Sequence, residues 1–307
     1  KLRHKLIPFL YTCAYRANKN AEMLIEPLYY YHQNNVRAYE YGDEYYFGKS
    51  LIVAPVVTPE EKDGYARVKV WLPQGNYTDI FTGDYYAVTS AEGEEKTLLR
   101  TLESIPVLAK AGTILPLSEE KGNGAPNPET LTVKVFSGNG EFTLYEDGRE
   151  EGKNGEFFTD FTARESVLQD GKKVQTLEIS SRGESGVIPE NRRLRVRFEN
   201  IGKGKVTLKI NGKEEKTPKI YADCVWVETP FTAGKTCEIA VEYVPEAPFG
   251  EWKKRATKIL TESDGSNVLN GEANAAIARL ESVQKTEMFF AQSKLPVCVI
   301  ERLKETL

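Results

Sequence analysis

Hydrophobic and polar positions follow three different patterns along this chain of 307 residues. Over residues 2–18, apolar side chains recur every three or four positions, which predicts one amphipathic helix. Pro8 lies inside this helix and removes one backbone hydrogen bond, so we expect a kink there. Such a helix needs a partner for its apolar stripe, and this chain need not contain that partner. The stripe comprises Leu2, Leu6, Phe9, Leu10, Cys13, Ala14 and Ala17.

The pattern changes to that of strands from about residue 40. Residues 50–57 form a continuous apolar run, which is typical of a strand buried on both faces. Residues 66–72 alternate between apolar and charged side chains, and residues 98–102 and 105–108 indicate further strands. Turn residues at 73–76 and 82–84 separate them. Short strands with turns every eight to twelve residues predict a β-sandwich.

A Gly- and Pro-rich stretch at residues 121–128 indicates a linker. A second series of short strands follows it, with Asn211-Gly212 as a two-residue hairpin turn. This series predicts a second sandwich that ends near residue 244. Its expected strands are residues 131–136, 141–145, 175–180, 193–198, 205–210, 224–228 and 237–243.

Residues 249–307 return to helical spacing. One apolar stripe runs from Trp252 to Leu260 and another from Leu269 to Leu280, while Pro296 suits the first position of a last helix. Three short helices are too small to fold alone. We therefore expect them to pack on the second sandwich or on a domain outside this chain.

Composition excludes several classes of function. The net charge is -4 and no basic cluster with interleaved aromatic residues occurs, which argues against a nucleic-acid partner. No stretch approaches the roughly 18 apolar residues that span a bilayer. The basic residues at the N-terminus precede a segment too polar for a signal peptide, and the absence of an initiator Met suggests that Lys1 is a cut end.

The four cysteines are widely spaced and match no metal-ligand pattern. Cys13 and Cys298 fall on apolar helical faces, where cysteine usually serves as a small buried hydrophobe. A disulfide between Cys224 and Cys237 is the alternative to reduced thiols. We expect reduced thiols in a cytoplasmic protein.

The sequence contains only weak candidates for catalytic or phosphate-binding residues. Two Gly-Lys-Ser/Thr triplets, at 48–50 and 234–236, lack the upstream glycine that a phosphate-binding loop requires. Carboxylate pairs at 43–44, 146–147 and 150–151 are adjacent in sequence, so their side chains face opposite ways on a strand, and we interpret them as solvated strand ends or turns. We assign no catalytic, cofactor-binding or metal-binding residue, and no cofactor.

An aromatic triplet at Tyr29-Tyr30-Tyr31 precedes His32 and a run of amide side chains. These residues could line a sugar cleft, because sugars stack on aromatic rings and bond to amides. The favoured interpretation is that the tyrosines lie at a contact between two domains, where amphipathic aromatics are common.

Three segments between residues 41 and 117 carry a resemblance to a known family. Residues 72–83 read Leu-Pro-Gln-Gly-Asn-Tyr-Thr-Asp-Ile-Phe-Thr-Gly, between Tyr-Gly-Asp-Glu-Tyr-Tyr-Phe-Gly-Lys-Ser-Leu-Ile-Val-Ala-Pro-Val at 41–56 and Ile-Pro-Val-Leu-Ala-Lys-Ala-Gly-Thr-Ile-Leu-Pro-Leu at 105–117. This order resembles the end of the catalytic barrel and the following sandwich of glycoside hydrolase family 31, the α-glucosidases and α-xylosidases. Tyr77 stands where that family usually has Trp. Weaker similarity continues at residues 142–148, 189–193 and 210–213.

The resemblance implies a mainly β fold of two consecutive β-sandwich domains, with the last helix of a (β/α)8 barrel before them and a short helical extension after them. It places the barrel end at 1–38, a proximal sandwich at 39–120, a distal sandwich at 128–246 and the helical extension at 247–307. In that family two aspartates on the barrel perform retaining hydrolysis of α-glycosides. They lie upstream of the segments matched here, and none maps onto this sequence.

The chain is therefore expected to be the non-catalytic C-terminal portion of an α-glycosidase and inactive alone. Its expected partners are an upstream barrel and the α-linked oligosaccharide substrate of the parent enzyme, and a homo-oligomer is left open. The alternatives are a free-standing carbohydrate-binding or scaffold module, and a family member with transglycosylase or lyase chemistry. The helix at 2–18 argues against the free-standing module, since a self-contained module would not begin with half of an interface.

Overall fold

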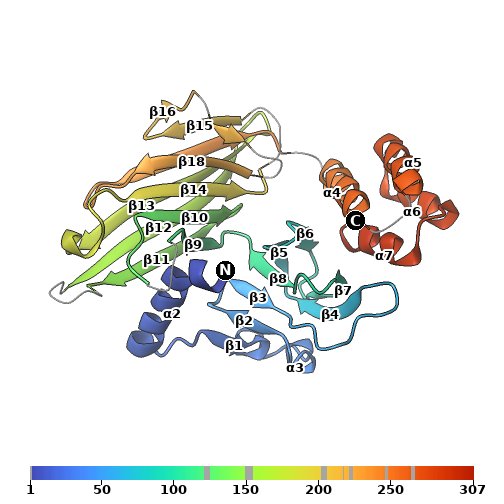
Figure 1. The fold of residues 1–307 in the computed structure, drawn as a ribbon, viewed down its shortest axis with the longest axis horizontal. Coiled ribbons are helices and arrows are strands. Elements are labelled where there is room, and N and C mark those ends of the chain that lie inside the picture. The colour runs from blue at the N-terminus through green and yellow to red at the C-terminus, as the bar shows by residue number, and fades with distance from the viewer. Residues whose placement is uncertain are drawn as a thin grey trace. The chain divides into compact units, whose positions relative to one another are not determined.

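The computed structural model describes residues 2–120, 125–148, 155–201, 206–216, 218–220, 224–245, 248–263 and 267–307. Residues 121–124 of the predicted linker and the carboxylate pair 150–151 lie outside the described residues. Strands dominate the ribbon in Figure 1, and helices are concentrated near the two chain ends. The mainly β fold with a helical C-terminal segment is therefore confirmed.

The chain divides into two compact units. The first comprises residues 1–26, 46–51 and 109–245, and the second comprises residues 27–45, 52–108 and 246–307. The boundary between the units falls within strands β1 (Ile25–Pro27), β2 (Tyr45–Phe47), β3 (Leu51–Val53) and β8 (Val107–Lys110).

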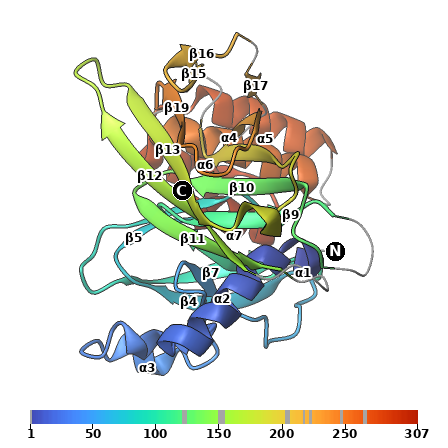
Figure 2. The same cartoon turned by 90° about the vertical axis from the view of Figure 1, so that its left-hand side faces the viewer.

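The first unit begins with the predicted amphipathic helix. It is interrupted next to Pro8, giving α1 (Leu2–Lys5) and α2 (Ile7–Asn20), in agreement with the expected kink. Helix α2 packs against strand β11 (Gly140–Asp147), as Figure 2 shows. The ring of Phe9 is 5.7 Å from that of Phe142, and the Tyr15 ring stacks on that of Tyr145 at 3.7 Å.

This packing corrects the expectation that the helix might lack a partner in the chain. Phe9 and Cys13, in the middle of the predicted stripe, are buried, whereas Ala14 and Ala17 are exposed. Gly48 lies in the turn between β2 and β3 against this helix. A Cβ atom built on Gly48 would lie 2.3 Å from the Phe9 ring, so only glycine fits there. Because the helix has a partner within the chain, it is no argument against a self-contained module.

Two sheets form the rest of the first unit. One has the strand order β17-β18-β14-β10-β9, and the other has the order β11-β12-β13-β19-β15-β16. The pair β10–β14 is parallel, and the other described pairs within these two sheets are antiparallel. The remaining strands are β9 (Ile114–Ser118), β10 (Thr130–Phe136), β12 (Glu156–Val167), β13 (Lys173–Gly183), β14 (Arg193–Glu199), β15 (Val206–Ile210), β16 (Lys213–Glu214), β17 (Lys219–Ile220), β18 (Cys224–Pro230) and β19 (Cys237–Tyr243).

Alternating apolar residues from these strands build the core of this sandwich. Leu131, Val133 and Val135 on β10 are fully buried, and so are Leu194, Val196 and Phe198 on the adjacent β14. All seven strands expected here are present. The expectation missed β12, the longest strand of the unit, although Phe157, Thr159, Phe161 and Ala163 alternate with polar or partly exposed residues and are buried. A short 3₁₀ helix, η2 (Ser185–Val187), follows β13.

The first β-rich stretch contributes to two further sheets. One has the strand order β1-β2-β3-β8-β5-β6, and the other is the two-stranded sheet β4-β7. Strand β4 (Ala66–Leu72) has the predicted bounds, with Val68, Val70 and Leu72 buried. Strand β3 is buried throughout as expected but ends before Pro55. The other strands are β5 (Gly75–Asp79), β6 (Tyr85–Val88) and β7 (Glu94–Arg100). Between β1 and β2 lie η1 (Leu28–Tyr30) and α3 (Arg37–Glu40).

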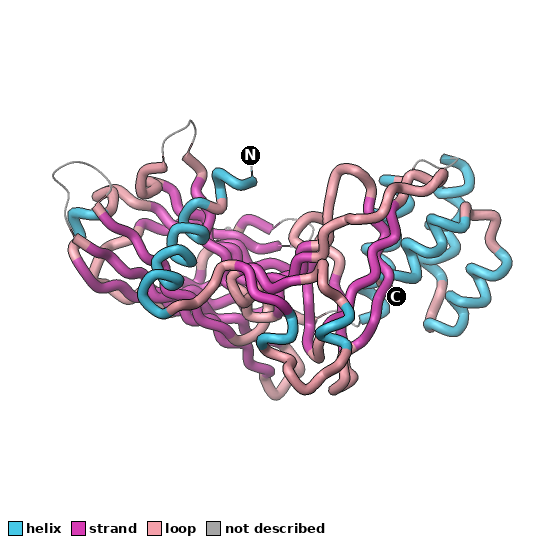
Figure 3. The backbone as a smooth tube through the Cα atoms, turned by 90° about the horizontal axis from the view of Figure 1, so that it is seen from below, coloured by secondary structure: helices cyan, strands magenta, loops and turns pink. Residues whose placement is uncertain are grey.

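The described residues after 247 form four helices, one more than expected. Figure 3 shows this C-terminal part as helical. The helices are α4 (Pro248–Glu262), α5 (Asn267–Arg279), α6 (Val283–Gln292) and α7 (Val297–Glu305). Helix α6 was missed because only Thr286 and Phe290 of its ten residues are buried, which leaves little apolar periodicity.

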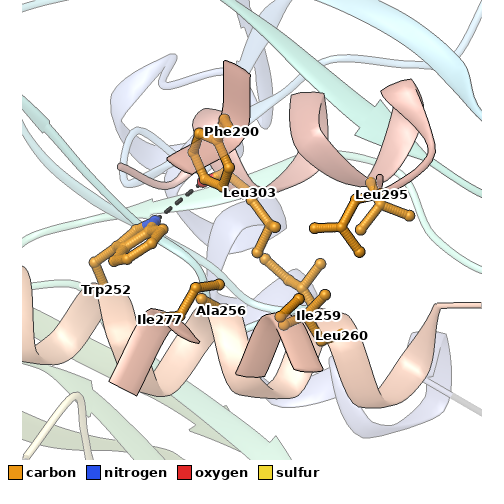
Figure 4. Packing of buried hydrophobic residues seen from close by; sticks show 10 residues of the cluster. Trp252, Ala256, Ile259, Leu260, Ile277, Phe290, Leu295 and Leu303 are labelled. Atoms are coloured by element: carbon orange, nitrogen blue, oxygen red, sulfur yellow. Dashed lines mark hydrogen bonds between the residues drawn. The ribbon is translucent and has the colours of Figure 1, made fainter. Parts of the chain in front are cut away.

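The helices share a core of their own. Trp252, Ala256 and Leu303 are buried in it, and the Trp252 indole donates a hydrogen bond of 3.0 Å to the Leu303 carbonyl oxygen (Figure 4). Helix α7 also packs on β7 of the second unit. This contact with the first β-rich stretch was not among the two expected partners, which were the second sandwich and a domain outside this chain.

Candidate functional site

The carboxylates singled out in the sequence have structural partners. Glu146 is buried on β11, and Arg192 donates two hydrogen bonds to it, at 2.5 Å and 2.8 Å. The Arg192 Nε donates a third to the Pro128 carbonyl oxygen, at 3.0 Å. Glu146 is therefore a buried, paired carboxylate rather than a solvated strand end. Asp147 beside it accepts a hydrogen bond from the Tyr11 hydroxyl on α2.

The first Gly-Lys-Ser triplet forms a turn and offers no phosphate cradle. The Gly48 N–H donates to the Leu24 carbonyl oxygen at 2.8 Å, so it is not available to a phosphate. Lys49 forms an ion pair of 2.9 Å with Glu22. Both groups are thus used within the first unit.

The second unit contains a groove of about 500 Å³ beside the other carboxylate pair. Its walls come from α3, from the segment leading into β2, from the residues after β3 and from the neighbouring strands β4 and β7. The lining residues are Arg37, Glu40, Tyr41, Gly42, Asp43, Glu44, Ala54, Pro55, Val57, Thr58, Arg67, Val68, Lys69 and Glu95.

A hydrogen-bonded group of side chains forms one wall of this groove. The Tyr41 hydroxyl donates to Glu95, and Arg37 lies 3.1 Å from Glu40 and 3.9 Å from Glu95. The Tyr41 bond together with the charges of Lys69 and Arg37 lowers the pKa of Glu95. Partial burial and the same Glu95 contact raise the pKa of Tyr41 to about 12. At neutral pH the wall therefore presents an ionised carboxylate, fixed by its neighbours, and a protonated phenol.

Glu44 lies at the groove with its side chain almost completely removed from water. One carboxyl oxygen accepts a hydrogen bond from the Trp71 N–H at 2.9 Å. The other oxygen, Oε1, has no hydrogen-bond partner among the described residues. Burial raises the pKa of Glu44 to about 8, so the group is mostly protonated at neutral pH.

The sequence interpretation of Glu44 as a solvated residue is therefore wrong, whereas Asp43 is exposed as expected. A signal for this burial existed. Glu44 is two residues before Tyr46, which is buried on β2, and positions two apart share a face of a strand.

The tyrosines at 29–31 do not line the groove. Tyr29, Tyr30 and Tyr31 are 38%, 47% and 47% exposed. The Tyr29 ring stacks parallel to the Tyr39 ring at 5.0 Å and meets the Tyr30 ring edge-on at 5.5 Å. We call Tyr29, Tyr30 and Tyr39 the tyrosine cluster. His32 packs its ring edge-on against Trp71, at 5.3 Å, in the same unit.

Asp79, the acidic residue of the segment 72–83, is completely buried. Its Oδ1 accepts hydrogen bonds from the N–H groups of Phe81 and Thr82, which fixes the turn after β5. Its Oδ2 lies 2.6 Å from Arg100 Nη2. The role of Asp79 is thus to close a turn and to neutralise a buried cation.

Helix α7 completes this ionic network. Glu305 lies 3.0 Å from Arg100 and also accepts hydrogen bonds from the Tyr86 hydroxyl at 2.7 Å and from the Leu99 N–H at 2.9 Å. Arg302 pairs with Asp84. The network could not be predicted from the sequence, because Glu305 and Arg302 on α7 lie more than 200 residues from Arg100 and Asp84.

The four cysteines are free, so the Cys224–Cys237 disulfide does not form, and burial raises the pKa of Cys13 to about 11. Within the described ranges, no three His, Cys, Asp or Glu side chains are grouped to hold a metal ion. No helix in the described part of the chain is long and apolar enough to cross a membrane.

Comparison with known proteins finds similarity to one family. Residues 21–115 match the family model of the glycosyl hydrolase family 31 C-terminal domain. The chain is 28% identical over 151 residues to alpha-glucosidase 2 of Bacillus thermoamyloliquefaciens, which covers 48% of the chain and 18% of that protein. It is 28% identical over 226 residues to the alpha-xylosidase of Saccharolobus solfataricus, which covers 68% of the chain and 29% of that protein.

Among solved structures, the family 31 dextranase FjDex31A of Flavobacterium johnsoniae has the same fold. It aligns with a TM-score of 0.62 and 21% identity, over 78% of this chain and 32% of the dextranase. The chain thus spans less than a third of the length of each of these proteins. The resemblance seen at residues 41–117 is confirmed.

Proposed function

We propose that the chain is the non-catalytic C-terminal portion of a retaining α-glycosidase, because residues 21–115 match the family model of the glycosyl hydrolase family 31 C-terminal domain. The observation that carries the proposal is the agreement of two comparisons. The family match covers 21–115, and the fold match extends over 78% of the chain but only 32% of a family 31 enzyme. We assign the catalytic barrel to the remaining length of such an enzyme.

The proposed activity is hydrolysis of α-glucosides or α-xylosides by a parent polypeptide. Retaining hydrolysis needs two carboxyl groups about 5–5.5 Å apart on either side of the sugar. Glu146 is committed to Arg192 and Asp79 to Arg100, so neither is free to act as nucleophile or acid. This supports the assignment of the two catalytic aspartates to the upstream barrel and of a supporting role to this chain.

We also propose the domain division of the parent. Residues 1–38 end the barrel, 39–120 form the proximal sandwich, 128–246 the distal sandwich and 247–307 the helical extension. The ionic network supports a structural role for the extension, because Glu305 pairs with Arg100 of β7 and Arg302 pairs with Asp84 in the turn before β6. The four free thiols favour a reducing compartment, and we propose a cytoplasmic location.

The tyrosine cluster is the proposed contact surface for the upstream barrel. Its rings are held against one another yet remain well exposed, and exposed aromatic groups of this kind are typical of protein contacts. Hydrogen exchange tests this proposal. Segment 28–41 should exchange more slowly in the parent polypeptide than in the 307-residue chain, and equal exchange rates would contradict it.

An activity assay tests the proposed function. The parent polypeptide and the 307-residue chain are each assayed with 4-nitrophenyl α-glucoside and 4-nitrophenyl α-xyloside. We expect hydrolysis by the parent and none by the chain. Analysis of the parent's products then separates hydrolysis from the transglycosylase or lyase alternative. Hydrolysis by the purified chain that rises in proportion to its concentration would overturn the assignment.

A further inference from the structure

We propose that the groove beside Glu44 is a binding site for a neutral oligosaccharide. The choice of an α-linked glucose oligomer as the ligand rests on the proposed function. The site itself is argued from the groove's volume, its balance of charge and its arrangement of hydrogen-bonding groups.

The size of the groove suits such a ligand. Ligand sites usually enclose about 300–1,000 Å³, and this groove of about 500 Å³ falls within that range. Its lining is mixed. Tyr41, Pro55 and Val57 offer apolar surface for the C–H faces of a sugar ring, and charged side chains surround them.

The charges of the groove balance. Its lining includes three cations, Arg37, Arg67 and Lys69, and three exposed acids, Glu40, Asp43 and Glu95. Glu44 adds no charge at neutral pH, because burial keeps it protonated. A phosphate or a metal ion would need an excess of one sign, so the groove favours a neutral polar ligand.

The polar groups are already oriented. Tyr41 and Arg37 hold Glu95 on one wall, and Lys69 contributes to lowering its pKa. Neighbouring sugar hydroxyls need donors and acceptors close together, and a fixed carboxylate beside Arg and Lys supplies both. Glu44 adds a buried carboxyl whose Oε1 has no partner in the described part of the chain. The polar groups of the groove are therefore held in place before a ligand binds.

Nuclear magnetic resonance tests this proposal on the 307-residue chain, with maltotriose and isomaltotriose as probes. We expect either trisaccharide to shift the amide signals of Gly42, Asp43 and Lys69. The variant Glu95→Ala should weaken binding by about tenfold or more. Lys69→Ala should also weaken it, while Glu103→Ala, which removes an exposed carboxylate outside the groove, should leave it unchanged.

Three results would overturn the proposal. The first is no shift of groove signals at about 50 mM trisaccharide, where even a weak site would be partly occupied. The second is binding that neither Glu95→Ala nor Lys69→Ala changes. The third is stronger binding of inorganic phosphate at the same signals. The parent's hydrolytic activity is measured separately. If the parent is active but the groove signals do not shift, only this site is rejected. If the parent is inactive but the groove signals shift, only the proposed function is rejected.

Discussion

Arg100 and Asp79 form a fully buried ion pair, with 2.6 Å between Nη2 and Oδ2. Asp79 comes from the segment that carries the family resemblance, and Arg100 ends the strand β7. The same arginine contacts Glu305 on the last helix at 3.0 Å. The pair therefore connects the turn after β5 with the C-terminal helices of the second unit.

Replacing Asp79 by Asn should destabilise the second unit. The amide keeps an acceptor for the turn, but Arg100 loses a buried counter-charge, and breaking a buried pair costs about 3–5 kcal/mol. Urea unfolding followed by tryptophan fluorescence measures this, because Trp71 and Trp252 both lie in the second unit. Asp170→Asn, which removes an exposed charge in the first unit, should shift the midpoint little. Equal midpoints for both variants would contradict the structural role of Asp79.

The last helix should be required for the stability of the second unit. Glu305→Ala removes the acceptor of Tyr86, Leu99 and Arg100 at once, and a cost of about 3–5 kcal/mol is expected. The matched control is Glu287→Ala, an exposed glutamate on α6, for which about 0.5 kcal/mol or less is expected. The measurement is the free energy of unfolding in urea. If the two variants lost the same free energy of unfolding, the claim that α7 stabilises the second unit would be contradicted.

Helix α2 should depend on one buried hydroxyl. Thr12 Oγ1 donates to the Pro8 carbonyl oxygen and accepts from the Tyr145 N–H at 3.1 Å. Thr12→Val keeps the shape but leaves that N–H unpaired, at a cost of about 1–3 kcal/mol. Thr12→Ser keeps the hydroxyl and should cost less. Hydrogen exchange at the Tyr145 amide is the direct readout, and unchanged protection in the valine variant would refute this role.

Stability should fall with rising pH because of Glu44. Burial raises its pKa in the folded chain from 4.5 to about 8. Above pH 4.5 the unfolded chain releases this proton while the folded chain keeps it, so the stabilising contribution is present below pH 4.5 and is lost up to about pH 8. Glu44→Gln removes this titration. Melting temperatures from pH 5 to pH 9 should therefore favour the variant increasingly as pH rises, and a constant difference would contradict the raised pKa.

Most of the helices and strands can be predicted from local sequence patterns. Strand β4 has the predicted bounds because Val68 and Val70 alternate with the charged residues Arg67 and Lys69. The break beside Pro8 follows from its missing N–H. Strand β12 was missed although its alternation is clear at Phe157 and Phe161. Helix α6 gave almost no signal, since most of its surface is exposed.

The long-range partners of the buried charged side chains could not be predicted from the sequence. Nothing near Glu146 in the sequence indicates Arg192, and nothing near Arg100 indicates Glu305, because long-range contacts depend on the completed fold. Local composition suggested solvated acids, whereas Glu146 and Glu44 are buried. The partner of helix α2 was left open for the same reason, since β11 lies more than 100 residues away.

The intact mass of the denatured native polypeptide that carries this sequence tests the central claim most directly. The 307 residues have a mass of 34.5 kDa. A C-terminal portion of an α-glycosidase predicts a mass well above this value, with the excess attached before Lys1. A native mass of 34.5 kDa would contradict a covalently attached catalytic barrel and would favour a free-standing module or a separate barrel subunit.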